Sequence, residues 1–206
     1  MRFRCGLAFL LYGVATSLSV TGCSSQLDVA NRDSRGTTII CFGDSLTQGV
    51  GASPGHDYPS LLAKTLAREV INGGVSGETT QEALRRLDSD VLSRDPKLVI
   101  VEFGGNDFLH QLPRAETFTN LDEIVRRIQE RGAMVVLVGV QPGLLGDATR
   151  GDYQRIARKR HAAFIPNILD GILTDPQLKS DELHPNDAGY EKIAQRILQV
   201  VTLLLR

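Results

Sequence analysis

A serine, an aspartate and a histidine in this chain are of the residue types that nucleophilic catalysis uses. Ser45 lies in the string Gly-Asp-Ser-Leu directly after an apolar run, and a serine hydroxyl becomes a good nucleophile only when a base removes its proton. His184 is the best candidate for that base. Asp181, three residues earlier, could hold the other ring nitrogen and fix the tautomer. The expected chemistry is acyl transfer to Ser45, and activity should fall in acid as His184 becomes protonated.

Acyl transfer creates a negative oxygen, and three groups in the sequence could donate hydrogen bonds to it. They are the backbone N–H of Ser45, the backbone N–H of Gly77, where glycine permits close approach, and the side-chain amide of Asn106. Removing one donor of this kind typically slows an enzyme by about 10²–10³. The amide of Asn106 is therefore expected to matter for turnover.

The apolar pattern predicts the elements that must position these residues. Continuous apolar runs indicate strands buried on both faces, as in a parallel sheet. The strong runs cover residues 37–42, 98–103 and 134–140, and weaker ones cover 70–71 and 162–165. Helical apolar stripes fall within residues 58–66, 84–91, 118–128 and 190–201. This alternation predicts an α/β fold with right-handed crossovers and helices on both faces of a mostly parallel sheet.

The polar segments fall where the predicted strands end. Segments 43–46, 72–79 and 104–107 each follow a strand, and 181–186 lies between the last strand and the closing helix. In open α/β sheets, ligands bind outside the carboxyl ends of the strands. The sequence thus predicts one site assembled from four loops that are distant in the chain.

Four motifs together resemble the GDSL, or SGNH, hydrolase family: Gly-Asp-Ser-Leu, an isolated glycine, Gly-x-Asn-Asp and a late Asp-x-x-His. The four residues that name the family fall on Ser45, Gly77, Asn106 and His184, and Asp181 completes the triad. The choice of Gly77 among the glycines of its loop rests on the family's Ser-Gly-Asp/Glu-Thr context. The longer strings around these motifs look like the bacterial branch that contains lysophospholipase, arylesterase and thioesterase I enzymes.

The resemblance covers nearly all of the chain after Thr37. It implies a flavodoxin-like, three-layer α/β/α sandwich and hydrolysis of acyl esters or thioesters without a metal or cofactor. The implied partner is a small acyl ester or lipid. Apolar residues near the loops, Phe108, Leu109, Leu144 and Leu145, could line an acyl groove or simply pack in the interior.

Other interpretations stay open beside this one. A carbohydrate O-acetylesterase would use the same fold, and a non-catalytic flavodoxin-like module could bind phosphate at the first turn. That turn lacks the P-loop Gly-Lys-Ser/Thr and the dinucleotide Gly-x-Gly-x-x-Gly spacing, and Asp44 would repel a phosphate. Asp44 or Ser45, taken singly, could also cap a helix. His56, His110 and His161 are rival bases, but none of them has the Asp-x-x-His context.

Composition excludes several classes of protein. The 206 residues are 42% hydrophobic and 23% charged, which suits one domain with a complete core. A formal net charge of −1 argues against a nucleic-acid binder, which usually has a basic excess. Three cysteines cannot form a disulfide framework, and no spacing indicates structural zinc. Cys41, inside an apolar run, is expected to be a small core residue.

The first residues have the layout of an export signal. Arg2 and Arg4 precede an apolar run that ends near Val20, and the Val-Thr-Gly-Cys that follows resembles the bacterial lipobox, whose cysteine is lipidated after cleavage. The resemblance implies that Cys23 becomes the lipidated N-terminus. The apolar run is short for a membrane-spanning helix, which needs about 20 residues.

This address divides the chain into a signal peptide over residues 1–22, a polar tether over 23–36 and the hydrolase domain over 37–206. The expected protein is an exported lipoprotein that is anchored to a membrane of the bacterial cell envelope. The alternatives are a cleaved secretory signal that leaves a soluble periplasmic or secreted protein, and an uncleaved anchor.

Overall fold

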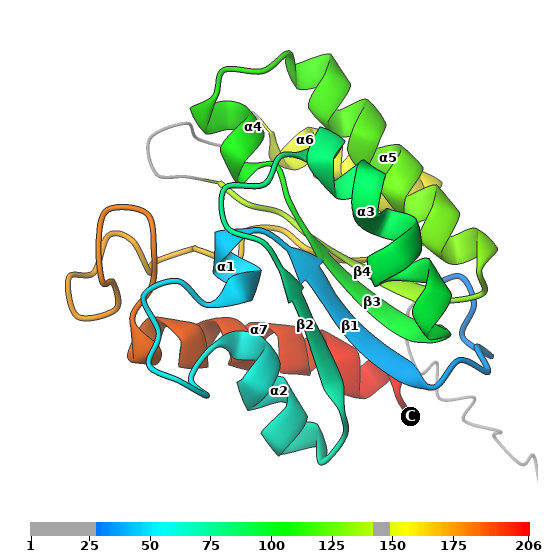
Figure 1. Cartoon of the computed structure of the whole chain (residues 1–206), viewed down its shortest axis with the longest axis horizontal. Coiled ribbons are helices and arrows are strands. Elements are labelled where there is room, and N and C mark those ends of the chain that lie inside the picture. The colour runs from blue at the N-terminus through cyan, green and yellow to red at the C-terminus, as the bar shows by residue number, and fades with distance from the viewer. Residues whose placement is uncertain (1–27, 142–148) are drawn as a thin grey trace, which may run out of the picture.

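The structure is a computed structural model that describes residues 28–141 and 149–206. Its strands form a five-stranded sheet in the order β2-β1-β3-β4-β5, with every neighbouring pair parallel (Figure 1). The strands are β1 (Thr38–Gly43), β2 (Val70–Gly74), β3 (Pro96–Glu102), β4 (Met134–Val138) and β5 (Ala163–Ile165). All five predicted strands are confirmed, and their order is the flavodoxin-like one.

Helices follow the strands in the alternation that the sequence predicts. The longer ones are α2 (Tyr58–Leu66), α3 (Thr80–Asp90), α5 (Arg114–Glu130), α6 (Arg150–Lys159) and α7 (Asp187–Leu204). The short ones are α1 (Ser45–Gln48), α4 (Gly105–Leu109) and the 3₁₀ turn η1 (Leu92–Arg94). The apolar pattern does not predict α6, whose buried apolar side chains are only Tyr153, Ile156 and Ala157. Among the described residues, no helix combines the length and apolar character needed to span a bilayer.

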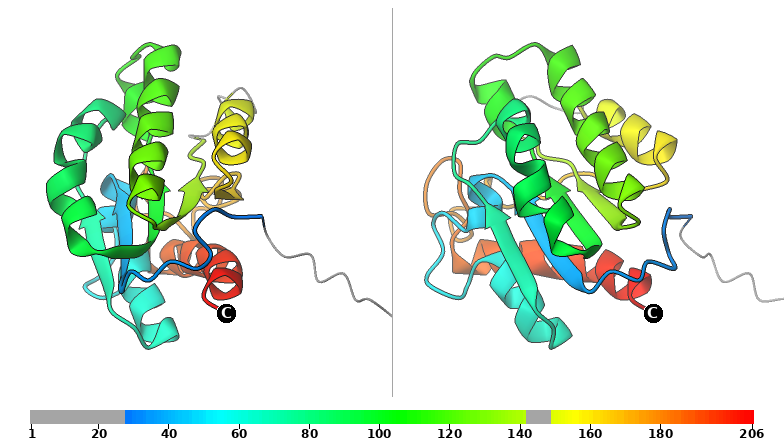
Figure 2. Two further views of the ribbon diagram at one scale, coloured as in Figure 1. Left: turned by 90° about the vertical axis from the view of Figure 1, so that its right-hand side faces the viewer. Right: turned by 45° about the vertical axis from the view of Figure 1, so that its right-hand side comes forward.

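The sheet contributes side chains to two hydrophobic cores, one on each face, because successive side chains of a strand point to opposite faces. In β1, Ile39 and Cys41 pack on the side covered by α2 and α7, whereas Ile40 and Phe42 pack on the side covered by α3, α5 and α6. Figure 2 shows helices on both sides of the sheet. The three-layer α/β/α sandwich is therefore confirmed, and Cys41 is the buried core residue that its apolar surroundings predict.

Side-chain caps fix where the helices begin. Asp57 Oδ1 accepts a hydrogen bond from Ser60 N (3.0 Å) at the start of α2. Thr79 and Glu82 form a capping box at the start of α3. Asn186, two residues after His184, caps the start of α7, where its Oδ1 accepts a hydrogen bond from Gly189 N (3.1 Å). These caps set the entry angle of each helix and hence the direction of the preceding loop.

The segment before β1 is joined to the body, which differs from the tether predicted over residues 23–36. Val29 is buried in the core on the α7 side of the sheet. Ala30 N donates to His161 O (2.8 Å), and Asn31 Nδ2 donates to Gln129 O (2.8 Å). A polar composition alone does not reveal these contacts, because they are made mostly through backbone groups. Residues 29–31 therefore already pack against the domain.

Candidate active site

Ser45 lies where β1 turns into the short helix α1. Asp44 caps that helix, and its Oδ1 accepts a hydrogen bond from Leu46 N at 3.1 Å. A Cβ on Gly43 would come within 2.7 Å of Glu102 Oε2. Only glycine therefore allows the strand end to pack this closely against its neighbours. The turn presents Ser45 at the carboxyl edge of the sheet, where the sequence predicts it.

His184 lies in the loop before α7, where the Asp181 side chain organises a tight turn. Asp181 Oδ1 accepts hydrogen bonds from the backbone N–H of Leu183 (2.7 Å) and of His184 (2.8 Å). The other carboxylate oxygen lies 2.9 Å from His184 Nδ1. These contacts, the Leu183 amide first, lower the pKa of Asp181 below its ordinary value. A charged carboxylate at this position favours the His184 tautomer that carries its proton on Nδ1.

The two loops meet although their residues are 139 positions apart in the chain. His184 Nε2 lies 3.0 Å from Ser45 Oγ. With the proton on Nδ1, the lone pair of Nε2 can accept the hydrogen of the serine hydroxyl. The structure therefore brings Ser45, His184 and Asp181 into one hydrogen-bonded row, with the spacing that proton transfer requires.

Two backbone N–H groups beside this row can bind negative charge. Within the described residues, neither the Ser45 N–H nor the Gly77 N–H has a hydrogen-bond acceptor, and both residues line the same cavity. Gly77 has a φ of +81°, which favours glycine on conformational grounds. Gly73 and Gly74 instead belong to β2, where a Cβ on Gly74 would lie 2.1 Å from Gln48 N. Gly77 is thus the glycine of its loop that faces the cavity.

Asn106 is buried in α4 with both hydrogens of its amide already used. Its Nδ2 donates to Asp44 Oδ2 and to Glu78 O, each at 3.0 Å. Donation to a substrate oxyanion therefore requires Asn106 to share or give up one of these bonds. The next residue, Asp107, accepts hydrogen bonds from Thr80 N (3.0 Å) and Thr80 Oγ1 (2.5 Å), which ties α4 to α3.

Comparison with known proteins decides the family. The profile of the GDSL-like Lipase/Acylhydrolase family matches residues 41–192. The chain belongs to this family. The match spans Ser45, Gly77, Asn106, Asp181 and His184, and membership makes the chain a hydrolase of acyl esters.

Curated relatives of this acylhydrolase agree with that assignment. Esterase TesA of Pseudomonas aeruginosa is 28% identical over 92% of this chain and 99% of that protein. Arylesterase of Vibrio mimicus is 31% identical over 78% of this chain and 86% of that protein. Thioesterase 1/protease 1/lysophospholipase L1 of Escherichia coli K12 is 29% identical over 76% of this chain and 79% of that protein. A crystal structure of TesA superposes with a TM-score of 0.77 at 28% identity, covering 82% of this chain and 99% of that one.

A small cavity in front of Ser45 is lined on one side by leucines. Its volume is about 150 Å³. Of the residues predicted to line an acyl groove, Leu109 lines the cavity, whereas the Phe108 ring lies 6.4 Å from that of Phe118. Leu144 and Leu145 lie outside the described residues. The other apolar lining residues are Leu46, Val140, Leu169, Leu173 and Leu183.

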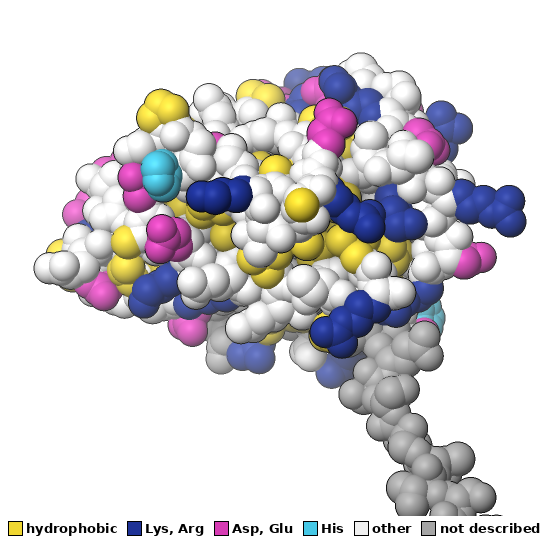
Figure 3. All heavy atoms as spheres, turned by 90° about the horizontal axis from the view of Figure 1, so that it is seen from below, with side chains coloured by type: hydrophobic (Ala, Val, Ile, Leu, Met, Phe, Trp, Pro, Cys, Tyr) yellow, Lys and Arg dark blue, Asp and Glu magenta, His cyan; other side chains and the backbone are white. Residues whose placement is uncertain are grey.

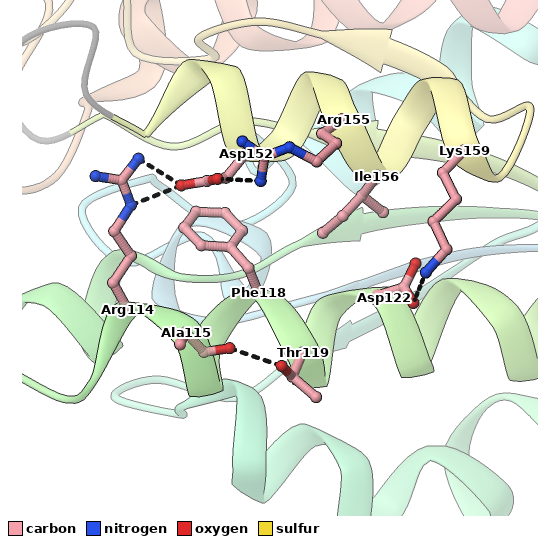
Figure 4. Close-up of a pocket in the computed structure, with 9 residues that line it drawn as sticks. All are labelled: Arg114, Ala115, Phe118, Thr119, Asp122, Asp152, Arg155, Ile156 and Lys159. Atoms are coloured by element: carbon pink, nitrogen blue, oxygen red, sulfur yellow. Dashed lines mark hydrogen bonds and ion pairs between the residues drawn. The ribbon is translucent and has the colours of Figure 1, made fainter.

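A larger hollow, of about 630 Å³, lies between α5 and α6 (Figure 4). Phe118 lines it, and the charged side chains at its edge bind one another: Arg114 and Arg155 both pair with Asp152. The described residues that line it include no serine, cysteine or histidine. The hollow therefore lacks the groups that ester hydrolysis needs, despite its size.

The rival histidines lie elsewhere. His161 Nδ1 pairs with Asp28 (2.9 Å) beside the start of β5, and His56 and His110 are exposed in loops. In the part of the chain that the structure describes, His184 is the histidine in contact with Ser45. Over the same residues, no cluster of three or more His, Cys, Asp or Glu side chains could hold a metal ion.

Sequence reasoning missed two features of the site. The leucines at 169, 173 and 183 come from an irregular segment without a strand or helix pattern, so no periodicity points to them. Glu102 is buried beside Asp44 at the end of β3. The signal for Glu102 was present, because it is a charged residue inside an otherwise apolar strand.

Proposed function

We propose that this acylhydrolase works through an acyl-enzyme on Ser45. The hydroxyl attacks the acyl carbonyl while His184 Nε2 accepts its proton, and Asp181 orients the imidazole and stabilises the imidazolium. The observation that carries the proposal is the 3.0 Å contact between Ser45 Oγ and His184 Nε2. His184 then protonates the leaving alcohol or thiol, and a water activated by the same histidine releases the acid.

The proposed oxyanion donors are the N–H groups of Ser45 and Gly77 and the side-chain amide of Asn106. The two backbone groups have no acceptor among residues 28–141 and 149–206, so they can bind the oxyanion without breaking a contact there. Asn106 must turn part of its amide from the neutral Glu78 carbonyl toward the oxyanion. That exchange favours the transition state, because a charged acceptor binds a donor more strongly than a neutral carbonyl does.

The leucine-lined cavity supports an apolar acyl chain as the substrate's acid portion. The cavity of about 150 Å³ is smaller than the roughly 300–1,000 Å³ of sites that enclose a drug-sized ligand. It would hold the carbons nearest the carbonyl, and the exposed Leu109 and Leu183 would contact the rest. Lysophospholipids, long-chain acyl thioesters and aryl esters of longer acids all present such a chain.

Covalent labelling tests the nucleophile. A fluorophosphonate probe should label the wild type once, on Ser45, and Ser45→Ala should lose both the label and p-nitrophenyl ester turnover. Ser76→Ala is the matched control, since Ser76 lines the same cavity without contacting His184 in the described structure, and it should still be labelled. A Ser45→Ala variant that keeps wild-type turnover would refute the assignment. Absence of any label on active wild type would do so as well.

A series of acyl chain lengths tests the substrate class. The rate constant kcat/KM on p-nitrophenyl esters should rise from acetyl to longer chains and should depend on the leucines. Leu173→Ser should reduce the gain per added methylene, because it replaces apolar lining with a hydroxyl. A profile that is restricted to acetyl esters would instead favour the carbohydrate O-acetylesterase.

We also propose that residues 1–22 are a lipoprotein signal peptide, that Cys23 carries the lipid and that the hydrolase domain follows. The basic start, apolar run and Val-Thr-Gly-Cys string support this division. The membrane would be one of a bacterial envelope. Because the packed domain begins by residue 29, the link between lipid and domain would be only a few residues long.

A lipid on Cys23 would hold the domain by the edge opposite the site. Ala30 bonds to His161, just before the start of β5, whereas Ser45 follows the end of β1 (Figure 1). On the described face over α2 and α7, Lys and Arg side chains are interspersed with hydrophobic and acidic ones (Figure 3). The lipid, not a uniformly basic face, would supply the attachment.

Fractionation of cells tests the anchor. The native chain should sediment with membranes and partition into detergent, and Cys23→Ser should be recovered in the soluble fraction with unchanged kcat. A Cys23→Ser variant that still partitions like the native chain would refute lipidation at this residue.

A further inference from the structure

Two carboxyl groups are buried side by side behind Ser45. Glu102 is the last residue of β3 and is 1% exposed, and Asp44 follows β1 and is 2% exposed. The register of the sheet brings them together, because Gly43 and Glu102 are partners across β1 and β3. The chemical steps proposed above do not use Glu102, although burying a carboxyl group is costly unless it is well bonded.

A row of hydroxyl groups leads to one oxygen of Glu102. Thr47 Oγ1 donates to Glu102 Oε2 at 2.8 Å, and Tyr58 OH lies 2.7 Å from Thr47 Oγ1. Because Thr47 has a single hydroxyl hydrogen, Tyr58 must be the donor to Thr47. Asp44 N also donates to Glu102 Oε2, at 3.4 Å. This oxygen is therefore well satisfied as an acceptor.

The other oxygen, Glu102 Oε1, is buried and has no hydrogen-bond donor among the described residues, so it is the oxygen left to carry a proton. Burial first, and the charge of Asp44 second, raise the pKa of Glu102 well above its ordinary value. Burial also raises the pKa of Asp44, to about 6, although bonds from Leu46 N and from the Glu102 side chain oppose the rise. Of the two carboxyl groups, Glu102 therefore holds its proton more strongly, and Asp44 is the partner placed to accept a hydrogen bond from it.

Asp44 in turn holds the amide of Asn106, since its Oδ2 accepts from Asn106 Nδ2 at 3.0 Å. We propose that Glu102 is a positioning residue: its unpartnered Oε1 carries a proton that it donates in a hydrogen bond to Asp44, and this bond orients the oxyanion donor Asn106. The inference rests on the role proposed for Asn106. A buried row of hydrogen bonds then runs from Tyr58 through Thr47 and Glu102 to the edge of the site.

The neutral form of Glu102 matters for the charge behind the oxyanion. One carboxylate can be held by its donors, but a second negative charge in the same buried space would oppose the developing oxyanion. Other charged and ionisable groups also face the pair from the neighbouring elements. They are Tyr58, Arg86 through the Gly43 carbonyl, Asp107, Tyr153, His184 and Tyr190.

Two substitutions separate positioning from packing. Glu102→Gln keeps the shape, an acceptor for Thr47 and a donor for Asp44, so its kcat at pH 7 should stay within about threefold of the wild type. Glu102→Leu removes both polar functions, and misplacement of the Asn106 amide should lower kcat by about 10- to 100-fold with KM nearly unchanged. Glu82→Gln, in the capping box of α3, is the matched control and should alter neither constant.

The pH profile of kcat supplies a readout that a packing defect would not move. In Glu102→Leu the charged form of Asp44 loses a hydrogen-bond donor, which raises the pKa of Asp44. The fall of kcat in acid should therefore begin at a higher pH in Glu102→Leu and at the wild-type pH in Glu102→Gln. An acid limb that does not move in a folded Glu102→Leu would overturn the proposal. If that variant does not fold, a folded Glu102→Gln with kcat lowered more than tenfold would overturn it equally.

Labelling by the fluorophosphonate probe keeps this test separate from the proposed function. If the active wild type is not labelled at Ser45, the acyl-enzyme mechanism itself is wrong. If Ser45 is labelled normally and the Glu102 variants give the contrary results above, only the role of Glu102 is wrong.

Discussion

Removal of the Asn106 amide is expected to slow turnover by about 20- to 150-fold. A single side-chain donor to an oxyanion is worth about 2.7–4 kcal/mol. In the resting structure, however, the same amide already donates to Glu78 O and Asp44 Oδ2 at 3.0 Å each. Giving up the bond to the neutral Glu78 carbonyl costs about 1 kcal/mol. The net stabilisation of the transition state is then about 1.7–3 kcal/mol, and each 1.36 kcal/mol is a factor of ten in rate.

The assay is steady-state hydrolysis of a p-nitrophenyl ester by Asn106→Ala, with the unfolding free energy measured in parallel. Asn120→Ala is the matched control, because its Nδ2 donates to Thr80 Oγ1 (3.1 Å) away from the cavity. Both variants lose a hydrogen-bonded amide, buried in Asn106 and half-buried in Asn120, and should lose stability, but only Asn106→Ala should lose kcat. A folded Asn106→Ala whose kcat falls less than threefold would show that Asn106 is no oxyanion donor. A loss of kcat well above 10³-fold would show that breaking the bond to Glu78 does not reduce the stabilisation that Asn106 gives to the oxyanion.

Three further substitutions probe the electrostatics. Asp181→Asn should lower kcat by about 10²–10³ in the ester assay. This is less than the roughly 10⁴ lost with a fully buried triad carboxylate, because the Asp181 side chain is 54% exposed and water can partly replace it. An unchanged kcat would exclude Asp181 as the group that orients His184. Bonds from Arg160 lower the pKa of Asp122 to about 2, which stabilises the fold above pH 4 and is lost as pH falls toward 2. Asp122→Asn should therefore reduce the unfolding free energy in urea by about 1–2 kcal/mol at pH 7 and by almost nothing near pH 2. Burial raises the pKa of Asp44 to about 6 in the folded protein, so this carboxyl ionises at lower pH in the unfolded chain than in the folded one. The unfolding free energy should therefore fall as pH rises from about 4 to about 6. Asp44→Asn should flatten this dependence in urea titrations, and an equal dependence in the variant and the wild type would contradict the raised pKa.

Much of the architecture follows from local patterns. The continuous apolar runs of β1, β3 and β4 predict strands buried on both faces of the sheet, and the 3.6-residue stripes place α2, α5 and α7. The two edge strands, β2 and β5, have shorter runs and are less completely buried. The helix α6 escaped prediction since its apolar stripe is short and most of its residues are charged or polar. The polar composition predicts a tether over residues 23–36, and it hides the packing of the described part, 28–36, for a similar reason. Its attachment depends on backbone bonds to His161 and on side-chain bonds to distant carbonyls.

The sequence by itself determined which residue types stand at the strand ends: a serine after β1, a glycine after β2, an asparagine after β3 and an Asp-x-x-His before the last helix. Only the tertiary structure decided that Ser45 and His184 lie 3.0 Å apart and that the Asn106 amide is shared with Asp44. It also decided that Glu102 is buried against a second carboxyl group. The physical reason is that proton affinity and hydrogen-bond partners depend on which distant groups exclude water from a side chain, and residues 139 positions apart leave no local pattern of that meeting.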